Sequence, residues 1–489
     1  MGNKDIKICL SMDQRSSVFG YAIATLLRER YQVKTFYDIG CRKKDEAFFK
    51  FQKEFSYTPL FIKEELDKKA KEEKIDISYL KSLGEEYGLP NLWPYITMDR
   101  YFMVNHQKTE YLEPRPALSH DQMLKHLQVY FREIKKSLEQ ALPDVIIFEA
   151  VGSTESYILY QIAKKMGIRT IILDHFRIGN WVILNDNCYN IFSKANEIFE
   201  LLRKGSRQSR FNEEARVFLK RLLEEPSSPY YDDASSKFPS FFNKLSKVAR
   251  YFIEFSKEGS SILYLKRHWI KSWRKFTGSG LVFEKPKKGE DFAFFPLHFE
   301  PELATLLLAP FYVNQIALIQ NIAKSLPVHF KLYVKEHPAM LYYRFPSYFK
   351  ELKKIPNVRL IDTRVNSFDL IRESKIVLTI TGTAGWEAVL LKKPIITFGS
   401  CFYNKLPQVQ HSDNIEELPS LIKESLENHQ HNEEELTDFI SAILETSLPL
   451  DYMKLCWSGS VSSKEILEDQ DFHNFVAVLA KEFKLRPLE

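Results

Sequence analysis

The stretch from Phe330 to Tyr403 constrains the fold most, because short apolar runs alternate there with segments of helical spacing. The apolar runs predict buried strands at Lys331–Val334, Val358–Ile361, Ile376–Ile380 and Pro394–Phe398. The segments between them predict helices at Ser347–Lys354, Asn366–Glu373 and Gly385–Leu391. Strands joined by helices must cross over, so a parallel, doubly wound sheet is expected. Such sheets bind ligands beyond the carboxyl ends of their strands, and a ligand site is therefore expected at that edge.

A second α/β domain is expected before this stretch. Apolar runs at Ile6–Leu10 and Val33–Tyr37 flank a helical segment, and two further strands are expected at Asp144–Glu149 and Thr170–Asp174. With 489 residues and a hydrophobic fraction of 44%, two globular domains are the natural organisation. We expect a Rossmann-like domain with a helical insertion, a basic linker, and a Rossmann-like nucleotide-binding domain with a helical tail. Their ranges are 1–202 (insertion 42–135), 203–290 and 291–489.

Composition narrows the cellular setting. The net charge of +5 is too mild for a general nucleic-acid binder. The five cysteines are scattered, which fits a reducing cytoplasm and argues against a zinc site. Neither a signal peptide nor about 18 consecutive apolar residues is present, so a cytoplasmic protein without a transmembrane helix is expected.

The segment Lys237–Lys288 is strongly basic, with 13 Lys or Arg against three Glu. It could be a linker helix with a solvated basic face. Alternatively, it could dock peripherally on anionic lipid or an acidic glycan, since each Lys or Arg near a lipid surface adds about 1 kcal/mol. The sequence leaves both interpretations open.

The motif TGTAGWEA places a strand end directly before a helix start. Free N–H groups and the helix dipole favour an anion at such a position, so a phosphate site is expected. Its candidate residues are Thr381, Gly382, Thr383, Gly385 and Glu387. The glycines would let the backbone approach the ligand, and Glu387 could bind a ribose hydroxyl. The alternative is an ordinary turn capped by Thr383.

The motif KEHP lies at another strand end, with Lys335, Glu336, His337 and Pro338. His337 can donate to a phosphate and Lys335 can supply positive charge. Two polar motifs on one sheet edge favour a nucleotide site over two structural turns. His298 lies at a further strand end and is a candidate to face a cleft between the domains.

The first domain should supply a carboxylate, because transfer chemistry needs a base or a nucleophile. Asp174 is the first candidate and Glu149 the second, since both are expected at strand ends, and Glu155 opens the next helix. Structural roles compete: Asp174 could pair with Arg177, which is itself a cleft candidate, and Glu149 could cap the turn before Glu155.

The blocks FFPLHFEPE (Phe294–Glu302), KLYVKEHP (Lys331–Pro338), TGTAGWEA (Thr381–Ala388) and KPIITFGSCFY (Lys393–Tyr403) resemble the bacterial capsule polysaccharide synthesis family. Its members include Kdo transferases of capsule and lipopolysaccharide assembly. The His-Pro pair also resembles the motif with which bacterial sialyltransferases hold CMP. Weaker support comes from the segment Pro143–Leu173.

The resemblance implies a GT-B glycosyltransferase with a metal-independent site and no cofactor. It would transfer a sugar, with Kdo and CMP as the suggested sugar and nucleotide, to a glycan or glycolipid. His337 and Pro338 would meet the nucleotide, and Thr381, Gly382 and Thr383 its phosphate. The family's acidic-acidic-Gly motif is absent, and LDHF at Leu173–Phe176 is its nearest match. A nucleotide-sugar epimerase of the same fold and a non-catalytic binding module remain as alternatives.

Overall fold

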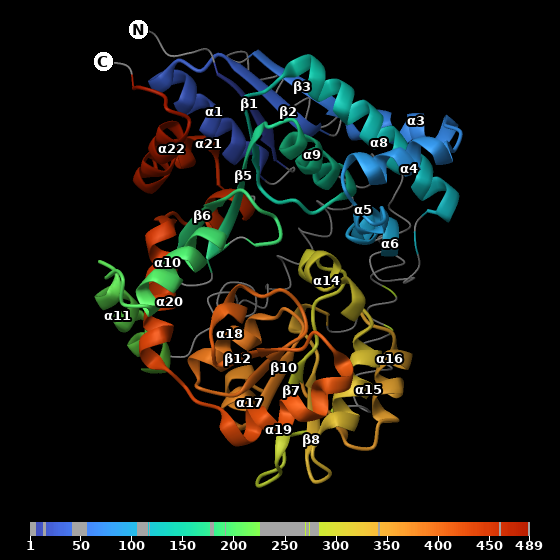
Figure 1. Cartoon of the computed structure of the whole chain (residues 1–489), viewed down its shortest axis with the longest axis vertical. Coiled ribbons are helices and arrows are strands. Elements are labelled where there is room, and N and C mark those ends of the chain that lie inside the picture. Colours follow the sequence, from blue (N-terminus) through green and yellow to red (C-terminus); the bar gives the residue numbers. More distant parts are fainter. Residues whose placement is uncertain are drawn as a thin grey trace. The chain divides into compact units, whose positions relative to one another are not determined.

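The computed structural model of the chain describes residues 6–12, 16–41, 56–104, 116, 118–176, 180–190, 192–224, 269, 273, 283–340, 343–458 and 461–487. The chain forms two compact units. The first unit comprises Met1–Asp99, Leu118–Ile198 and Ala442–Glu489, and the second comprises Arg100–Ala117 and Phe199–Ser441. Each unit is built on one mainly parallel sheet with flanking helices (Figure 1). The expected α/β class with two Rossmann-like sheets is confirmed.

The first unit has a seven-stranded sheet in the order β13-β6-β5-β4-β1-β2-β3. Its strands are β1 (Lys7–Ser11), β2 (Thr35–Cys41), β3 (Ser56–Ile62), β4 (Val145–Phe148), β5 (Arg169–Phe176), β6 (Trp181–Asn185) and β13 (Ser447–Pro449). Strands β1 to β5 pair in parallel, whereas β6 and β13 add antiparallel at one edge. From β3 to β6 the order is the 3-2-1-4-5-6 of a dinucleotide-binding fold.

The helices of the first unit are α1 (Ser17–Tyr31), α3 (Lys63–Glu72), α4 (Ile77–Glu86), α5 (Trp93–Thr97), α8 (His120–Ala141), α9 (Thr154–Lys165), α21 (Ser463–Glu468) and α22 (Gln470–Glu482). A one-turn π-helix, η5 (Met453–Trp457), precedes α21. None of the helices within the described ranges combines the length and apolarity that a membrane crossing requires.

The expected helical insertion at 42–135 is partly wrong. Its described part contains β3, which is the third strand of the sheet rather than an added helix. Tyr57, Thr58, Phe61 and Ile62 are residues that favour strands. Pro59 is tolerated because β3 lies at the sheet edge, where a missing N–H costs no ladder hydrogen bond. The Lys- and Glu-rich sequence that follows is typical of helices, so the whole segment was predicted to be helical.

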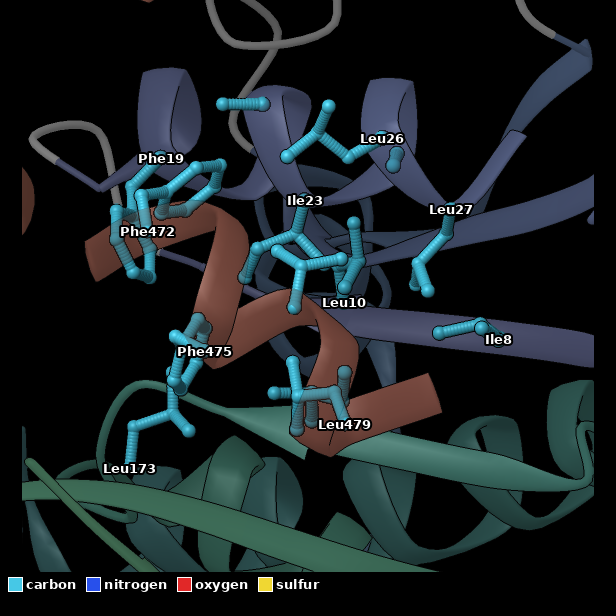
Figure 2. Packing of buried hydrophobic residues seen from close by; sticks show 14 of the residues in the cluster. Ile8, Leu10, Phe19, Ile23, Leu26, Leu27, Leu173, Phe472, Phe475 and Leu479 are labelled. Atoms are coloured by element: carbon cyan, nitrogen blue, oxygen red, sulfur yellow. The ribbon is translucent and has the colours of Figure 1, made fainter. Parts of the chain in front are cut away.

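The expected placement of the C-terminal residues with the second domain is also wrong, because 442–489 belong to the first unit. Apolar residues at helical spacing on α22 pack against α1. Figure 2 shows Phe472 of α22 beside Phe19 of α1, with ring centroids 5.3 Å apart. Phe475 lies 5.9 Å from the same ring, and Leu173 of β5 borders the cluster. The tail thus completes the core of the first sheet.

The second unit has a six-stranded sheet, parallel throughout, in the order β12-β11-β10-β7-β8-β9. Its strands are β7 (Phe292–Pro296), β8 (Lys331–Lys335), β9 (Val358–Ile361), β10 (Ile376–Thr379), β11 (Ile395–Thr397) and β12 (Val409–His411). The four strands expected from Phe330 to Tyr403 are confirmed to within a residue or two at their ends. Strand order reverses at β7, so the topological switch point lies between the carboxyl ends of β7 and β10.

The α-helices of the second unit are α6 (Arg100–Val104), α11 (Asn212–Glu224), α14 (Leu303–Leu308), α15 (Gln315–Ser325), α16 (Pro346–Lys353), α17 (Ser367–Glu373), α18 (Thr383–Leu390) and α19 (Leu418–Asn428). Short 3-10 turns are η1 (Pro310–Tyr312), η2 (Pro338–Met340), η3 (Phe402–Lys405) and η4 (Ile415–Glu417). The chain changes unit after residues 99 and 117, and again within α10 (Ser193–Arg203) and α20 (Glu433–Thr446). Most of the basic segment Lys237–Lys288 lies outside the described residues, and so does its predicted membrane contact.

Candidate functional site

The candidate site of the second unit is built around a hydrogen bond across the switch point. His298 follows β7 by two residues, and Thr381 follows β10 by two residues. The backbone N–H of Thr381 donates to Nε2 of His298 at 3.0 Å, and the Thr379 hydroxyl lies 3.4 Å from the same nitrogen. Because a backbone N–H can only donate, Nε2 acts as an acceptor. His298 therefore ties together the two strand ends that flank the predicted ligand position.

His298 is only 6% exposed, and buried neighbours hold its backbone in place. Its N–H donates to Oε1 of Gln315 on α15 at 2.8 Å, and its carbonyl accepts from the Arg344 guanidinium. From the sequence, His298 was predicted to face a cleft. The structure instead places it inside the packed sheet edge, where it positions Thr381.

The turn from β10 to α18 leaves donors for an anion. Gly382 is the N-cap residue, and its own N–H donates to the Thr379 hydroxyl at 3.1 Å. Thr383 is the first helical residue, so the alternative in which Thr383 caps the helix is wrong. The N–H groups of Thr383 and Ala384 have no acceptor within the helix, as at every helix start. The buried hydroxyl oxygen of Thr381 also has no hydrogen-bond partner in the structure.

The two glycines of this turn serve packing within the protein. A Cβ on Gly382 would lie 2.7 Å from the Thr379 hydroxyl oxygen. A Cβ on Gly385 would collide with the Tyr403 hydroxyl and lie 2.6 Å from Cδ1 of Ile395. The Tyr403 hydroxyl donates to the carbonyl of Gly382 at 2.7 Å. The sequence assigned both glycines to the approach of a ligand, whereas the structure shows them making room for protein side chains.

Lys335, the last residue of β8, is 5% exposed, and its Nζ donates to the Ser367 hydroxyl at the start of α17 at 2.6 Å. Burial lowers the pKa of Lys335 to about 8, although the carboxylates of Glu387 and Asp362 act in the opposite direction. Lys335 is therefore still mainly protonated at neutral pH. The structure brings Lys335 and Glu387, one from each motif, close enough to interact electrostatically.

Glu336 is a buried partner of Arg344. Its Oε2 lies 2.8 Å from Nε of Arg344, which also pairs with Glu300. Burial raises the pKa of Glu336 to about 7, while Arg344 and the His337 N–H act to lower it. Glu336 was nominated as a nucleotide-binding residue, but this pairing supports the loop. Nothing in the spacing of the sequence marked Arg344 or Glu300.

His337 follows Glu336 and packs edge-on against Phe299, with ring centroids 5.8 Å apart. Burial lowers the pKa of His337 to about 4, and the nearby positive charges of Arg344 and Lys335 add to this effect. The imidazole is therefore neutral at neutral pH and can offer a hydrogen bond but no charge. Pro338 is exposed and opens η2.

In the first unit, Glu149 directly follows β4 as expected, and its N–H donates to the Ser11 carbonyl at 3.1 Å. Asp174 was expected to end its strand, but β5 continues to Phe176, and Asp174 is paired with Ile183 of the neighbouring strand β6. Its Oδ1 accepts from the His175 N–H at 2.7 Å. The proposed partner Arg177 lies outside the described residues.

Glu155 is held by a cation that the sequence did not indicate. Its Oε1 lies 2.5 Å from Nζ of Lys63, and both side chains are 12% exposed. Burial acts to lower the pKa of Lys63, but Glu155, Asp99 and Asp67 outweigh it, so this pKa is raised. A tightly paired, buried carboxylate is typical of a structural ion pair.

The C-terminal segment contributes further residues beside the acids. The Tyr452 hydroxyl lies 3.5 Å from the carbonyl of Glu149, and His175 stacks on the Tyr452 ring at 6.5 Å. Burial raises the pKa of Tyr452 and of Cys456, and the nearby Glu149 carboxylate adds to both shifts. Sequence reasoning missed these residues because 303 positions separate Tyr452 from Glu149. Within the described ranges, no group of three or more His, Cys, Asp or Glu residues could hold a metal ion.

Comparisons with known proteins agree with the sequence motifs. Residues 311–409 match the family described as "Capsule polysaccharide biosynthesis protein". No curated protein matches the chain.

Similar solved structures include the beta Kdo 2,7 transferase of Thermosulfurimonas dismutans KpsC, with 13% identity, a TM-score of 0.37, and coverage of 72% of this chain and 89% of that chain. The beta Kdo 2,4 transferase of the same KpsC has 14% identity, a TM-score of 0.36, and coverage of 61% and 79%. UDP-GlcNAc 2-epimerase from Methanocaldococcus jannaschii has 13% identity, a TM-score of 0.29, and coverage of 90% and 99%. The resemblance to capsule polysaccharide biosynthesis proteins is thus confirmed over residues 311–409, the part of the chain that holds both motifs of the candidate site.

Proposed function

We propose that the protein is a glycosyltransferase of bacterial surface polysaccharide biosynthesis that uses a nucleotide-activated sugar. The observation that carries this proposal is the strand-end pair His298–Thr381, which sets the start of α18 at the switch point of the sheet. In doubly wound sheets this is the position of a nucleotide. The two motifs that flank it lie in the segment that matches the capsule family.

In this proposal the phosphates of the donor bind at the start of α18. The N–H groups of Thr383 and Ala384 and the hydroxyl of Thr381 donate hydrogen bonds, and the helix dipole favours the negative charge. Lys335 supplies the positive charge that stabilises the leaving phosphate, in place of a metal ion. Neutral His337 contributes a hydrogen bond.

An acid of the first unit completes the reaction, either as a base for the acceptor hydroxyl or as a nucleophile. Asp174 stays our first candidate, because its side chain is 33% exposed and can meet a substrate. Glu149 is the second candidate. Glu155 comes last because Lys63 already occupies its carboxylate. The resemblance of the His-Pro pair supports CMP as the nucleotide, and the family supports Kdo as the sugar.

The proposal is tested by incubating the full-length protein with labelled CMP-Kdo and a capsular glycan or glycolipid. Label on the acceptor is the expected result, and it should disappear in Asp174→Asn. Isomerisation of a nucleotide sugar without any acceptor would instead identify an epimerase. Nucleotide binding without either reaction would identify a binding module. Either of these two outcomes contradicts the proposal.

A further inference from the structure

The second unit holds a polar cavity at the end of its sheet that lies opposite the candidate nucleotide site. The cavity has a volume of about 330 Å³, which is at the lower end for small-molecule pockets. Ile395 is the first residue of β11, and Gln408 comes just before β12, so the cavity lies at the amino ends of these strands. The last turns of α19 and the loop that follows form its other wall. The candidate nucleotide site lies at the carboxyl ends of the same sheet.

Buried polar groups line this cavity without protein partners. Gln408 is 8% exposed and Ser425 is 4% exposed. Neither the amide nitrogen and oxygen of Gln408, nor the hydroxyl of Ser425, nor Nε2 of His429 has a hydrogen-bond partner. A buried polar group without a partner costs about 1–3 kcal/mol. Buried, unpaired polar atoms on three residues that line one cavity leave hydrogen bonds for a partner from outside the protein.

The lining selects against anions. No Lys or Arg is among the described residues that line the cavity, whereas Glu424 and Glu435 contribute carboxylates. Burial lowers the pKa of His429, so its ring is neutral, even though a hydrogen bond to the Lys392 backbone acts in the other direction. A phosphate or a carboxylate would therefore meet like charge and no counter-ion.

Groups that both donate and accept match the hydroxyls of a sugar. The Gln408 amide offers two donors and one acceptor, the Ser425 hydroxyl can do both, and the His429 nitrogen adds one more position. Ile395 and Pro407 provide an apolar surface for the C–H groups of a ring. We propose that this cavity binds an uncharged saccharide unit, at a second site separate from the nucleotide site.

The test uses the full-length protein and three uncharged probes: glucose, galactose and N-acetylglucosamine. Saturation-transfer NMR and calorimetry should show saturable binding of at least one probe, and no binding of inorganic phosphate at this site. Gln408→Leu removes the amide at nearly constant volume, and Ser425→Ala removes the hydroxyl. Each should weaken binding at least about tenfold, which corresponds to about 1.4 kcal/mol. The matched control Gln320→Leu, at an exposed position of α15, should leave binding unchanged.

A stability measurement separates a ligand site from a water-filled structural cavity. If the Gln408 amide forms its hydrogen bonds only with a ligand, Gln408→Leu should not lower the Tm in sugar-free buffer, because the substitution removes a desolvated polar group. Three results would overturn the proposal. The first is the lack of saturable binding up to about 10 mM, roughly ten times the Kd of a weak site. The second is sugar binding that Ser425→Ala and Gln408→Leu leave unchanged. The third is displacement of the sugar by phosphate. CMP binding serves as an independent control, because its loss would concern only the nucleotide site.

Discussion

Nε2 of His298 accepts a hydrogen bond of 3.0 Å from the backbone N–H of Thr381, and this bond joins the ends of β7 and β10. The two residues are 83 positions apart in the sequence. The bond fixes where α18 begins, and with it the direction of the N–H groups that are free to bind an anion. His298 is therefore a positioning residue, while Thr381 belongs to the proposed phosphate site.

Replacing His298 with Phe should weaken both the fold and nucleotide binding. The substitution keeps a ring but leaves the Thr381 N–H without its acceptor, which costs about 1–3 kcal/mol of unfolding free energy. CMP affinity, measured by calorimetry, should fall about tenfold or more, because the start of α18 shifts. His329→Phe is the matched control, since the His329 side chain is 65% exposed and precedes the amino end of β8, whereas His298 follows the carboxyl end of β7. Unchanged CMP affinity in His298→Phe would refute the positioning role.

The pKa of Lys335 predicts how nucleotide binding depends on pH. The proton that gives Lys335 its charge is present below about pH 8 and is lost as the pH rises through that value. CMP affinity should therefore fall above about pH 8. His337, with a pKa of about 4, is neutral throughout and should add no change near pH 6.5. Calorimetric titrations on both sides of pH 8 check this, and Lys335→Met should remove the alkaline loss. A persisting loss in that variant would assign the effect to another group.

Gly385→Ala should destabilise the second unit, because the added Cβ meets the Tyr403 hydroxyl and Ile395. Overpacking of this kind costs about 1–3 kcal/mol, measured by denaturant unfolding. Tyr403→Phe removes the hydroxyl but also its hydrogen bond to the Gly382 carbonyl. The double variant should therefore be more stable than the sum of the two single changes predicts. If the changes in unfolding free energy of the two single variants simply add up in the double variant, the two positions do not interact sterically.

Substitutions of Asp174 and Glu155 in the first unit should have different effects, one on sugar transfer and the other on stability. Asp174→Asn should abolish sugar transfer and leave CMP affinity unchanged, because Asp174 belongs to the other unit. Glu155→Gln should instead cost about 3–5 kcal/mol of stability, since it leaves the buried Lys63 without its partner. Transfer assays and thermal unfolding of both variants check this. If Asp174→Asn retains transfer, Glu149 takes its place as the candidate.

Much of the second sheet could be predicted from sequence, because a parallel sheet buried on both faces requires continuous apolar runs between helices. The same logic placed KEHP and TGTAG at one edge, since parallel strands share their carboxyl ends. The contacts that organise this edge could not be predicted. Arg344, which joins Glu336 to Glu300, lies in an ordinary loop, and the His298–Thr381 bond depends on which strands are neighbours.

The first unit was harder to predict for a related reason. The sequence predicted a helical tail at the C-terminus, but helical spacing cannot tell which sheet a helix covers. Only the fold shows that Phe472 packs on Phe19, and that Tyr452 comes to lie beside Glu149. Lys63 likewise lies 92 positions from Glu155. Pairings at such distances leave no local pattern in a single sequence.

The most direct test is a titration of the full-length protein with CMP, UDP, GDP and CDP, followed by calorimetry and amide hydrogen exchange. One nucleotide should bind with a one-to-one stoichiometry and slow exchange of the Thr383 and Ala384 amides at the start of α18. His337→Ala should lose this affinity while keeping its fold. Binding that protects other amides and leaves those at the start of α18 unchanged, or no binding by any of the four nucleotides, would contradict the nucleotide site proposed here.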